Sequence, residues 1–246
     1  MIGKIPNTLL RGLMDVLVPS VCVVCERKLV QEEHVLCSSC LSSIVRTEHA
    51  LIQNNGIDIL FADLVQKVGE HVRYQHGGAW GFYNSNRGQT LRTLIEKGKY
   101  GSRPFPEVFE HLGYLAALEF VDSDLFDDID LLVPVPLHPH RLRKRGFNQA
   151  EWICRGISRA MRIPIDTEHL VRVRDNAHQA RSQFDQRFEN TVGLFQVRYP
   201  EEWKNKHVLL VDDVITSGST LLSCMRQLTP IRGCTASVSA LGWAHN

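Results

Sequence analysis

Two adjacent carboxylates stand next to a run of hydroxyl side chains in the stretch VLLVDDVITSGST, which covers Val208 to Thr220. The apolar residues Val208–Val211 predict a buried strand that leads into the acid pair, and the residues from Thr220 onward predict a helix. Between them, the segment 216–220 supplies one glycine and four hydroxyl groups. Glycine permits close approach of a backbone and helix N-termini bind anions, so this segment predicts a phosphate-binding loop.

The acid pair requires a different ligand group from the loop, because carboxylates repel a phosphate. Neutral ribose hydroxyls and a bound Mg2+ both suit carboxylate oxygens. We therefore expect a sugar phosphate with its diol on Asp212 and Asp213. Its 5′-phosphate would lie on the loop, whose predicted contacts are Thr216, Ser217, Gly218, Ser219 and Thr220. In the competing interpretation, the two acids only cap a helix or a turn.

Four cysteines near the N-terminus form two CxxC pairs in the stretch CVVCERKLVQEEHVLCSSC. Each pair places two thiolates on a tight turn, and together they offer the four sulfur ligands of a tetrahedral zinc site. We predict a structural Zn2+ site formed by Cys22, Cys25, Cys37 and Cys40. An iron–sulfur or redox role is the alternative for this motif.

A basic run, HPHRLRKRG, follows the strand-like stretch DLLVPVPL. Arginine forks suit bidentate binding of phosphate, and a following glycine permits backbone approach. The candidate ligand-binding residues of this run are Arg141, Arg143, Lys144, Arg145 and Gly146. A solvated cationic face or a nonspecific DNA-binding patch would have the same composition.

A long polar segment from Ala177 to Phe195 lies between two strand-like patterns. Long connections of this kind are often functional, so the segment predicts a mobile lid over a ligand site. Its candidate ligand contacts are Gln179, Arg181 and Arg187. The alternative is an ordered surface hairpin whose charged residues serve only solubility.

Two helical patterns precede an alternation of strand and helix patterns that fills the C-terminal half of the chain. The strand-like stretches are DLLVPVPL, EHLVRVR, HVLLVDDV and CTASVSALGWA, and the helical ones are GQTLRTLIEKGKYG, FPEVFEHLGYLAALEF, NQAEWICRGISRAM and STLLSCMRQLTP. This alternation predicts an α/β fold with a mostly parallel sheet flanked by helices. Ligands of such sheets bind beyond the carboxyl ends of the strands, where the acid pair and its loop would lie.

Composition and length limit the class of protein. The chain has 246 residues, a net charge of +1, 43% hydrophobic and 22% charged residues, which is typical of a folded globular protein. The near-neutral charge gives no general attraction to nucleic acid. Arg11 and Asp15 interrupt the apolar residues at the N-terminus, so we expect no signal peptide, no membrane insertion and a cytoplasmic location.

The stretch VLLVDDVITSGST resembles the fingerprint of type I phosphoribosyltransferases, which bind phosphoribosyl pyrophosphate. Together with the CxxC pairs and the stretches VPVPLHPHRLRKRGFNQA and HQARSQFDQRFENTVGLF, it resembles the ComF family, a phosphoribosyltransferase-like group named for bacterial competence. The resemblance covers most of the chain from Cys22 onward. It implies that Asp212 and Asp213 contact the ribose 2′ and 3′ hydroxyls, that the basic run is the pyrophosphate loop, and that Mg2+ accompanies the ligand.

These features predict three segments in a type I phosphoribosyltransferase-like α/β protein. They are a small N-terminal zinc-binding module at 1–50, a connecting segment at 51–85 and a phosphoribosyltransferase-like domain at 86–246. One predicted function is glycosyl transfer, in which a phosphoribosyl group passes to an acceptor with release of pyrophosphate. No residue of the sequence identifies a catalytic group or the acceptor. The other is a noncatalytic accessory role in DNA uptake, in which the zinc module docks a competence helicase or single-stranded DNA.

Overall fold

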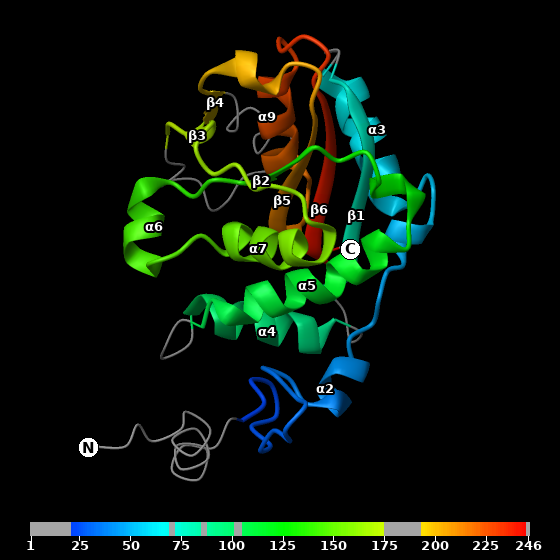
Figure 1. Ribbon diagram of the computed structural model, residues 1–246, viewed down its shortest axis with the longest axis vertical. Coiled ribbons are helices and arrows are strands. Elements are labelled where there is room, and N and C mark those ends of the chain that lie inside the picture. The colour runs from blue at the N-terminus through cyan, green and yellow to red at the C-terminus, as the bar shows by residue number, and fades with distance from the viewer. Residues whose placement is uncertain (1–20, 69–71, 85–87, 101–104, 175–192, 245–246) are drawn as a thin grey trace, which may run out of the picture.

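A four-stranded parallel sheet forms the centre of the molecule (Figure 1). The computed structural model describes residues 21–68, 72–84, 88–100, 105–174 and 193–244. Its sheet has the order β1-β6-β5-β2, with bounds Tyr74–Phe82 for β1, Leu131–Pro134 for β2, His207–Ile215 for β5 and Thr235–Trp243 for β6. Because β5 pairs in parallel with β2 and with β6, the acid pair belongs to an interior strand.

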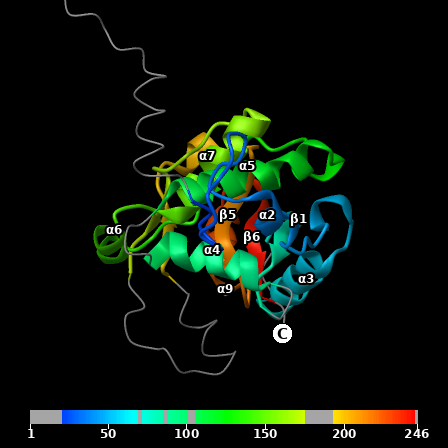
Figure 2. The same cartoon turned by 90° about the horizontal axis from the view of Figure 1, so that it is seen from below.

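Helices cover both faces of this sheet (Figures 1 and 2). One side carries α4 (Gln89–Tyr100), α5 (Glu107–Val121) and α7 (Gln149–Met161), and the other carries α3 (Gly56–Val68) and α9 (Ser219–Leu228). Side chains of β5 alternate between the two cores: Leu209 and Val211 join the first, and Val208 and Leu210 join the second. The arrangement confirms the predicted α/β class, with a parallel sheet flanked by helices.

Two glycines allow α5 and α7 to pack with their backbones in contact. A Cβ atom at Gly156 would lie 2.1 Å from the carbonyl oxygen of Glu110, and one at Gly113 would lie 2.4 Å from that of Ile153. These neighbours are backbone atoms and cannot move aside as a side chain can. The close crossing holds α7 against the sheet and thereby positions Gln149 at its first turn.

The predicted connecting segment 51–85 contributes a strand and a helix to the main body. β1 pairs in parallel with β6, for example Gly77 with Val238. Asp58 of α3 joins the helix to this strand, because its carboxylate accepts hydrogen bonds from the Tyr74 hydroxyl (2.5 Å) and the Gly77 N–H (2.9 Å). The three-segment division stays a prediction, but the sheet already begins before residue 86.

The predicted strand in EHLVRVR is present, but it lies outside the parallel sheet. β3 (Leu170–Arg172) pairs antiparallel with β4 (Phe195–Val197) in a separate two-stranded sheet. The remaining elements are short: α2 (Ser38–Ser42), α6 (Pro139–Arg145), η1 (His49–Leu51), η2 (Asp124–Phe126) and η3 (Pro200–Trp203). Within the ranges described above, no helix has both the length and the apolar character needed to cross a membrane.

The N-terminal cysteine-containing part packs beside α4, which separates it from α5 (Figure 1). Lys97 of α4 donates a hydrogen bond to the Val23 carbonyl (2.9 Å), and the Thr90 and Ser43 hydroxyls lie 2.8 Å apart. Residues two positions apart on a helix point to different sides, so Lys99 faces away from this contact. The two lysines place α4 between the cysteine module and the sheet.

Candidate functional site

The two adjacent acids lie near the carboxyl end of β5, where they point to opposite faces of the sheet. The strand extends to Ile215 rather than ending at Val211 as expected, and Asp212 pairs with Ala240 of β6. By the alternation of a strand, Asp213 shares the side of α4, α5 and α7, and Asp212 shares the side of α9. That both contact one ribose stays a prediction.

Asp213 is buried and held by two side chains from different helices. It is 6% exposed, and its Oδ2 atom forms an ion pair with the ammonium of Lys99. The same oxygen accepts a hydrogen bond from Nε2 of Gln149 at 3.0 Å. Lys99 comes from the last turn of α4 and Gln149 from the first residue of α7, whose start is capped by Asn148.

These contacts continue into the basic run. Arg145 donates a hydrogen bond to Oε1 of Gln149 (2.5 Å) and another to the Tyr100 hydroxyl (3.0 Å). Lys99, Arg145, Gln149 and Asp213 therefore form one connected set of polar side chains, which we call the Asp213 network. The network joins an acid of β5 to residues at the ends of α4, α6 and α7.

The basic run itself forms the short helix α6 rather than an open loop. Pro139 stands at its start, and Gly146 ends it with a φ of 86°, a left-handed conformation that favours glycine. Arg141, Arg143 and Lys144 are exposed on this helix, so Arg145 is the residue of the run that reaches the Asp213 network. A pyrophosphate-binding role for the other three stays a prediction.

The neighbouring carboxylate, Asp212, has a different electrostatic environment. Burial and the charge of Asp213 raise the pKa of Asp212 to about 7, although its Oδ1 accepts a hydrogen bond from the Asp213 N–H (2.8 Å) that acts in the opposite direction. Asp212 therefore takes up a proton near neutral pH, while Asp213 is ion-paired with Lys99. The two acids differ in environment as well as in direction.

The hydroxyl-rich loop ends at the N-terminus of α9, as its composition predicts. Gly218 is the N-cap residue with a φ of 72°, and the helix begins at Ser219, one residue before the expected Thr220. A Cβ at position 218 would lie 2.8 Å from a methyl group of Leu64 on α3. Both the conformation and the packing require glycine here. Phosphate binding by the loop stays a prediction.

The predicted lid lies almost entirely outside the described residues. Gln179, Arg181 and Arg187 are among the residues that the structure does not describe. At the end of the segment, Phe195 is buried as the first residue of β4.

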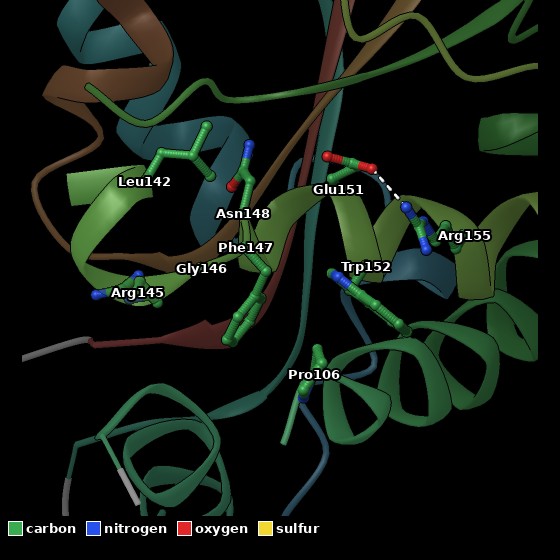
Figure 3. A pocket seen from close by; sticks show the side chains of 9 residues that line it. All are labelled: Pro106, Leu142, Arg145, Gly146, Phe147, Asn148, Glu151, Trp152 and Arg155. Atoms are coloured by element: carbon green, nitrogen blue, oxygen red, sulfur yellow. Dashed lines mark hydrogen bonds and ion pairs between the residues drawn. The ribbon is translucent and has the colours of Figure 1, made fainter. Parts of the chain in front are cut away.

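A pocket of about 530 Å³ lies next to the Asp213 network, between α6, the start of α7 and Pro106 (Figure 3). Leu142, Phe147 and Trp152 supply its apolar walls. The guanidinium carbon of Arg155 lies 4.4 Å from the centre of the Trp152 ring, while Arg155 also pairs with Glu151. Arg145 and Gly146 line the pocket too, so it adjoins the basic end of the network.

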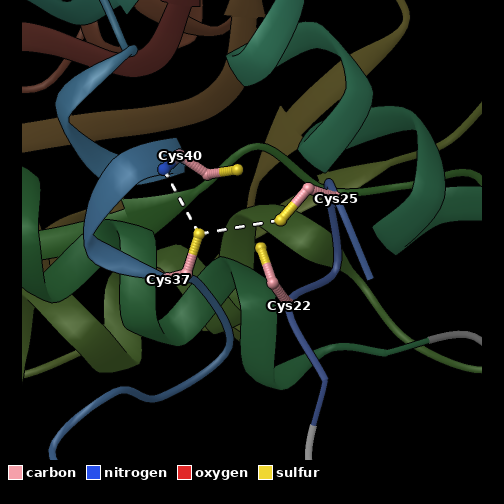
Figure 4. Close-up of side chains that lie close together, drawn as sticks. All are labelled: Cys22, Cys25, Cys37 and Cys40. Atoms are coloured by element: carbon pink, nitrogen blue, oxygen red, sulfur yellow. Dashed lines mark hydrogen bonds between the residues drawn. The ribbon is translucent and has the colours of Figure 1, made fainter. Parts of the chain in front are cut away.

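The four N-terminal cysteines converge (Figure 4). Their sulfur atoms all lie within 4.8 Å of one another, and the Cys25 and Cys37 sulfurs are 3.7 Å apart. Four thiolates bound tetrahedrally to zinc are separated by about 3.8 Å, as a Zn–S length of about 2.3 Å requires. Cys22, Cys25, Cys37 and Cys40 thus form a group that fits a metal ion. The N–H of Cys40 donates to the Cys37 sulfur, which lowers the pKa of that thiol to about 6 and favours the thiolate that a metal binds.

Comparisons with known proteins point to one family. Residues 153–240 match the model of the phosphoribosyl transferase domain. Over 232 residues, the chain is 27% identical to the DNA utilization protein YhgH of Escherichia coli O157:H7, covering 91% of this chain and 97% of the relative. It is 30% identical to Competence protein F of Haemophilus influenzae, over 54% of this chain and 59% of the relative. It is 31% identical to Competence protein ComFC of Bacillus subtilis, over 45% of this chain and 42% of that relative.

These similarities support a ComF-family protein. Its parallel sheet with helices on both faces and its cluster of four cysteines agree with the type I phosphoribosyltransferase-like fold and N-terminal metal module that the motifs imply. A solved allosteric regulatory enzyme of purine biosynthesis gives a TM-score of 0.34 at 17% identity over 58% of this chain. The match spans 29% of that enzyme's length and is too weak to bear on the fold.

Two members of the Asp213 network did not stand out in the sequence. Lys99 lies in GQTLRTLIEKGKYG and Gln149 in NQAEWICRGISRAM, stretches whose spacing indicates only helices. Their positions at helix ends could have indicated a role in the site. Lys99 is in the last turn of one helix, and Gln149 begins another helix that follows a strand and the basic run. Helix ends beside a parallel sheet are where such side chains reach a ligand.

Proposed function

We propose that this chain binds phosphoribosyl pyrophosphate with Mg2+ and transfers its phosphoribosyl group to an acceptor. The observation that carries the proposal is the Asp213 network, which connects a carboxylate of the predicted ribose site to Arg145 of the predicted pyrophosphate site. The similarity to competence proteins and the match to the phosphoribosyl transferase domain support the same ligand class.

Each part of the site has a chemical task in this proposal. The hydroxyls of 216–220 and the N–H groups at the start of α9 hold the 5′-phosphate. Asp212 and Asp213 accept hydrogen bonds from the ribose hydroxyls, and Arg145 offsets charge on the pyrophosphate. Mg2+, when bound with the ligand, neutralises part of the diphosphate charge. The bond from C1′ to the pyrophosphate oxygen breaks, and the acceptor supplies the electron pair for the new bond.

The cysteine module has a structural task. We propose that Zn2+ occupies the four thiolates, because a closed set of four sulfur ligands leaves no position for substrate. The metal would then supply folding energy to a part of the chain that is too short to bury a core of its own.

Calorimetric titration tests the proposed ligand. We expect the wild-type chain to bind phosphoribosyl pyrophosphate in the presence of Mg2+, and the double variant Asp212→Asn with Asp213→Asn to lose about 100-fold in affinity, since charge-assisted hydrogen bonds are among the strongest polar contacts. The alanine pair should behave in the same way. Tight binding by either double variant would contradict the site, and a screen for pyrophosphate release with nucleobases or ammonia would test transfer.

A second function, binding of single-stranded DNA in an accessory role, is favoured by a different observation. Three guanidiniums lie over exposed or half-buried aromatic rings: Arg155 over Trp152, Arg159 over Tyr114 and Arg145 over Tyr100, with carbon-to-centroid distances of 4.4, 4.2 and 5.1 Å. Stacking faces combined with cations are typical of surfaces that bind single strands. The names of the relatives, which refer to DNA utilization and competence, point in the same direction.

Fluorescence anisotropy with an oligothymidylate distinguishes the two functions. Accessory binding predicts a loss of about tenfold for Trp152→Ala, in the range measured for one stacked base, and a marked dependence on salt. Tyr199→Ala is a suitable control, because Tyr199 is 72% exposed on the segment that begins η3. Unchanged affinity in Trp152→Ala would count against this surface.

A further inference from the structure

Lys99 is a mostly buried cation in direct contact with Asp213. Its side chain is 15% exposed, and its ammonium contacts Oδ2 of Asp213, whose side chain is 8% exposed. Gln149 donates to the same oxygen at 3.0 Å. An ammonium and an amide therefore already occupy a carboxylate that the proposed function assigns to ribose.

The ion pair between Lys99 and Asp213 would be costly to break without a replacement partner. Removing one member of a buried ion pair leaves the other without compensation, which is strongly unfavourable. Asp213 therefore holds Lys99 firmly while no other anion is near. A ligand that brings its own negative charge offers the ammonium a second partner, whereas a neutral diol alone does not.

Arg145, the other cation of the Asp213 network, is tied elsewhere. Its guanidinium donates to Gln149 and to the Tyr100 hydroxyl and lies over the Tyr100 ring. Lys99 is the cation of the network that directly neutralises Asp213. A lysine is a compact charge on a flexible stem, so it can move between anions with little rearrangement of the backbone.

We propose that Lys99 exchanges partners when ligand binds. Its ammonium leaves Asp213 for the diphosphate at C1′ of the sugar, and the released carboxylate accepts hydrogen bonds from the ribose hydroxyls. This inference rests on the proposed function and sharpens its substrate class: the site selects ribose phosphates that carry an anionic group at C1′ over ribose 5-phosphate.

The exchange accounts for the burial of a single lysine beside an acid pair. Without Lys99, the network would present the uncompensated carboxylate of Asp213 to an incoming polyanion. With Lys99, binding of the diphosphate and binding of the diol are coupled. The diphosphate draws the Lys99 ammonium away from Asp213, and the Asp213 carboxylate is then available to the diol. A purely structural ion pair would instead stay closed and would make no distinction between the two sugars.

Calorimetry with two ligands tests the exchange on the full-length, metal-loaded chain. Phosphoribosyl pyrophosphate and ribose 5-phosphate are titrated separately in the same Mg2+ buffer into the wild type, Lys99→Met, Lys99→Arg and Arg92→Met. The last variant is the matched control, since it removes one cation from the same helix, where Arg92 pairs at the surface with Glu96. Circular dichroism at the titration temperature confirms that each variant is folded.

We expect Lys99→Met to lose about tenfold or more in affinity for phosphoribosyl pyrophosphate, the loss typical of one charge-assisted contact. Its affinity for ribose 5-phosphate should be unchanged or higher, because Asp213 is no longer occupied. Lys99→Arg should restore the preference, and Arg92→Met should match the wild type. An equal loss for both ligands, or an unchanged ratio, would overturn the exchange while leaving the proposed function intact. Failure of the wild type to bind either ligand would overturn both.

Discussion

Asp212 and Asp213 are neighbours in sequence but meet different surroundings. Asp213 points toward α4 and α7, where Lys99 and Gln149 hold it. Asp212 lies on the side of α9, where burial and the adjacent negative charge raise its pKa to about 7. Pairs of acids whose environments differ in this way are often able to take different chemical roles.

The raised pKa of Asp212 predicts a stability that falls as pH rises. In the unfolded chain this carboxyl ionises near its ordinary pKa of about 4, whereas in the folded chain it keeps its proton until about pH 7. The folded state therefore binds more protons between these values, and the free energy of unfolding decreases with pH across that window. Asp212→Asn should remove this dependence and be more stable than wild type at pH 8, by up to about 4 kcal/mol.

Urea unfolding at pH 4.5 and pH 8 measures this effect. The difference in the free energy of unfolding between Asp212→Asn and wild type should be largest at pH 8 and small at pH 4.5. Ser217→Ala in the adjoining loop is a control without a titrating group. A difference that does not depend on pH would show that Asp212 is not the responsible carboxyl.

For single residues, the sequence was sufficient to predict candidate site residues but not the side chains that contact them. The acid pair, the loop and the four cysteines were visible because their residue types are adjacent or regularly spaced. Lys99 reaches Asp213 across 114 positions of the chain, and only packing of α4 beside the sheet brings them together. No local pattern records such a contact.

Helices α5 and α7 pack with their backbones in close contact, which glycine makes possible. A Cβ at Gly156 would meet the Glu110 carbonyl oxygen at 2.1 Å, so the two backbones would have to separate. Gly156→Ala should therefore lower the free energy of unfolding by about 3 kcal/mol, as overpacking against an unyielding neighbour does. Chemical denaturation measures this loss.

Gly146→Ala is the contrasting variant. Gly146 has a φ of 86° with no neighbouring atom within 4 Å of an added Cβ, so its substitution introduces only backbone strain of about 1 kcal/mol. If the two variants were equally stable, the α5–α7 contact would be looser than the structure indicates. The comparison separates packing from conformational strain.

The elements that the sequence failed to indicate have physical reasons. β1 reads YQHGGAWGF, and its glycines and polar residues weaken the usual strand signal. Gly77 is required there because a Cβ would lie within 2.7 Å of Ile57, Tyr74 and Val238. The basic residues of α6 show no apolar face, so the sequence indicates a loop, yet His138 and Pro139 start a helix and Gly146 ends it.

For the molecule as a whole, the four-cysteine module predicts dependence on a bound metal. Mass spectrometry or a colorimetric assay should find about one equivalent of zinc per chain, as a closed four-thiolate site holds a single ion. Cys37→Ser should remove it and lower the melting temperature, because metal binding and folding of the module are coupled. Cys234→Ser, a change at a buried cysteine outside the cluster, should keep the metal. Full retention of zinc by Cys37→Ser would refute the assignment.

Lys97 and Lys99 sit two positions apart on one turn of α4. The first reaches the Val23 carbonyl, between two of the metal-binding cysteines, and the second reaches Asp213. Because a helix turn is stiff, we expect a change at either contact to alter the free energy of the other. Thermodynamic linkage requires such a coupling to be reciprocal. A sugar phosphate that draws Lys99 from Asp213 would then change the affinity of the cysteine module for its metal, and metal loss would change the affinity for the sugar by the same factor.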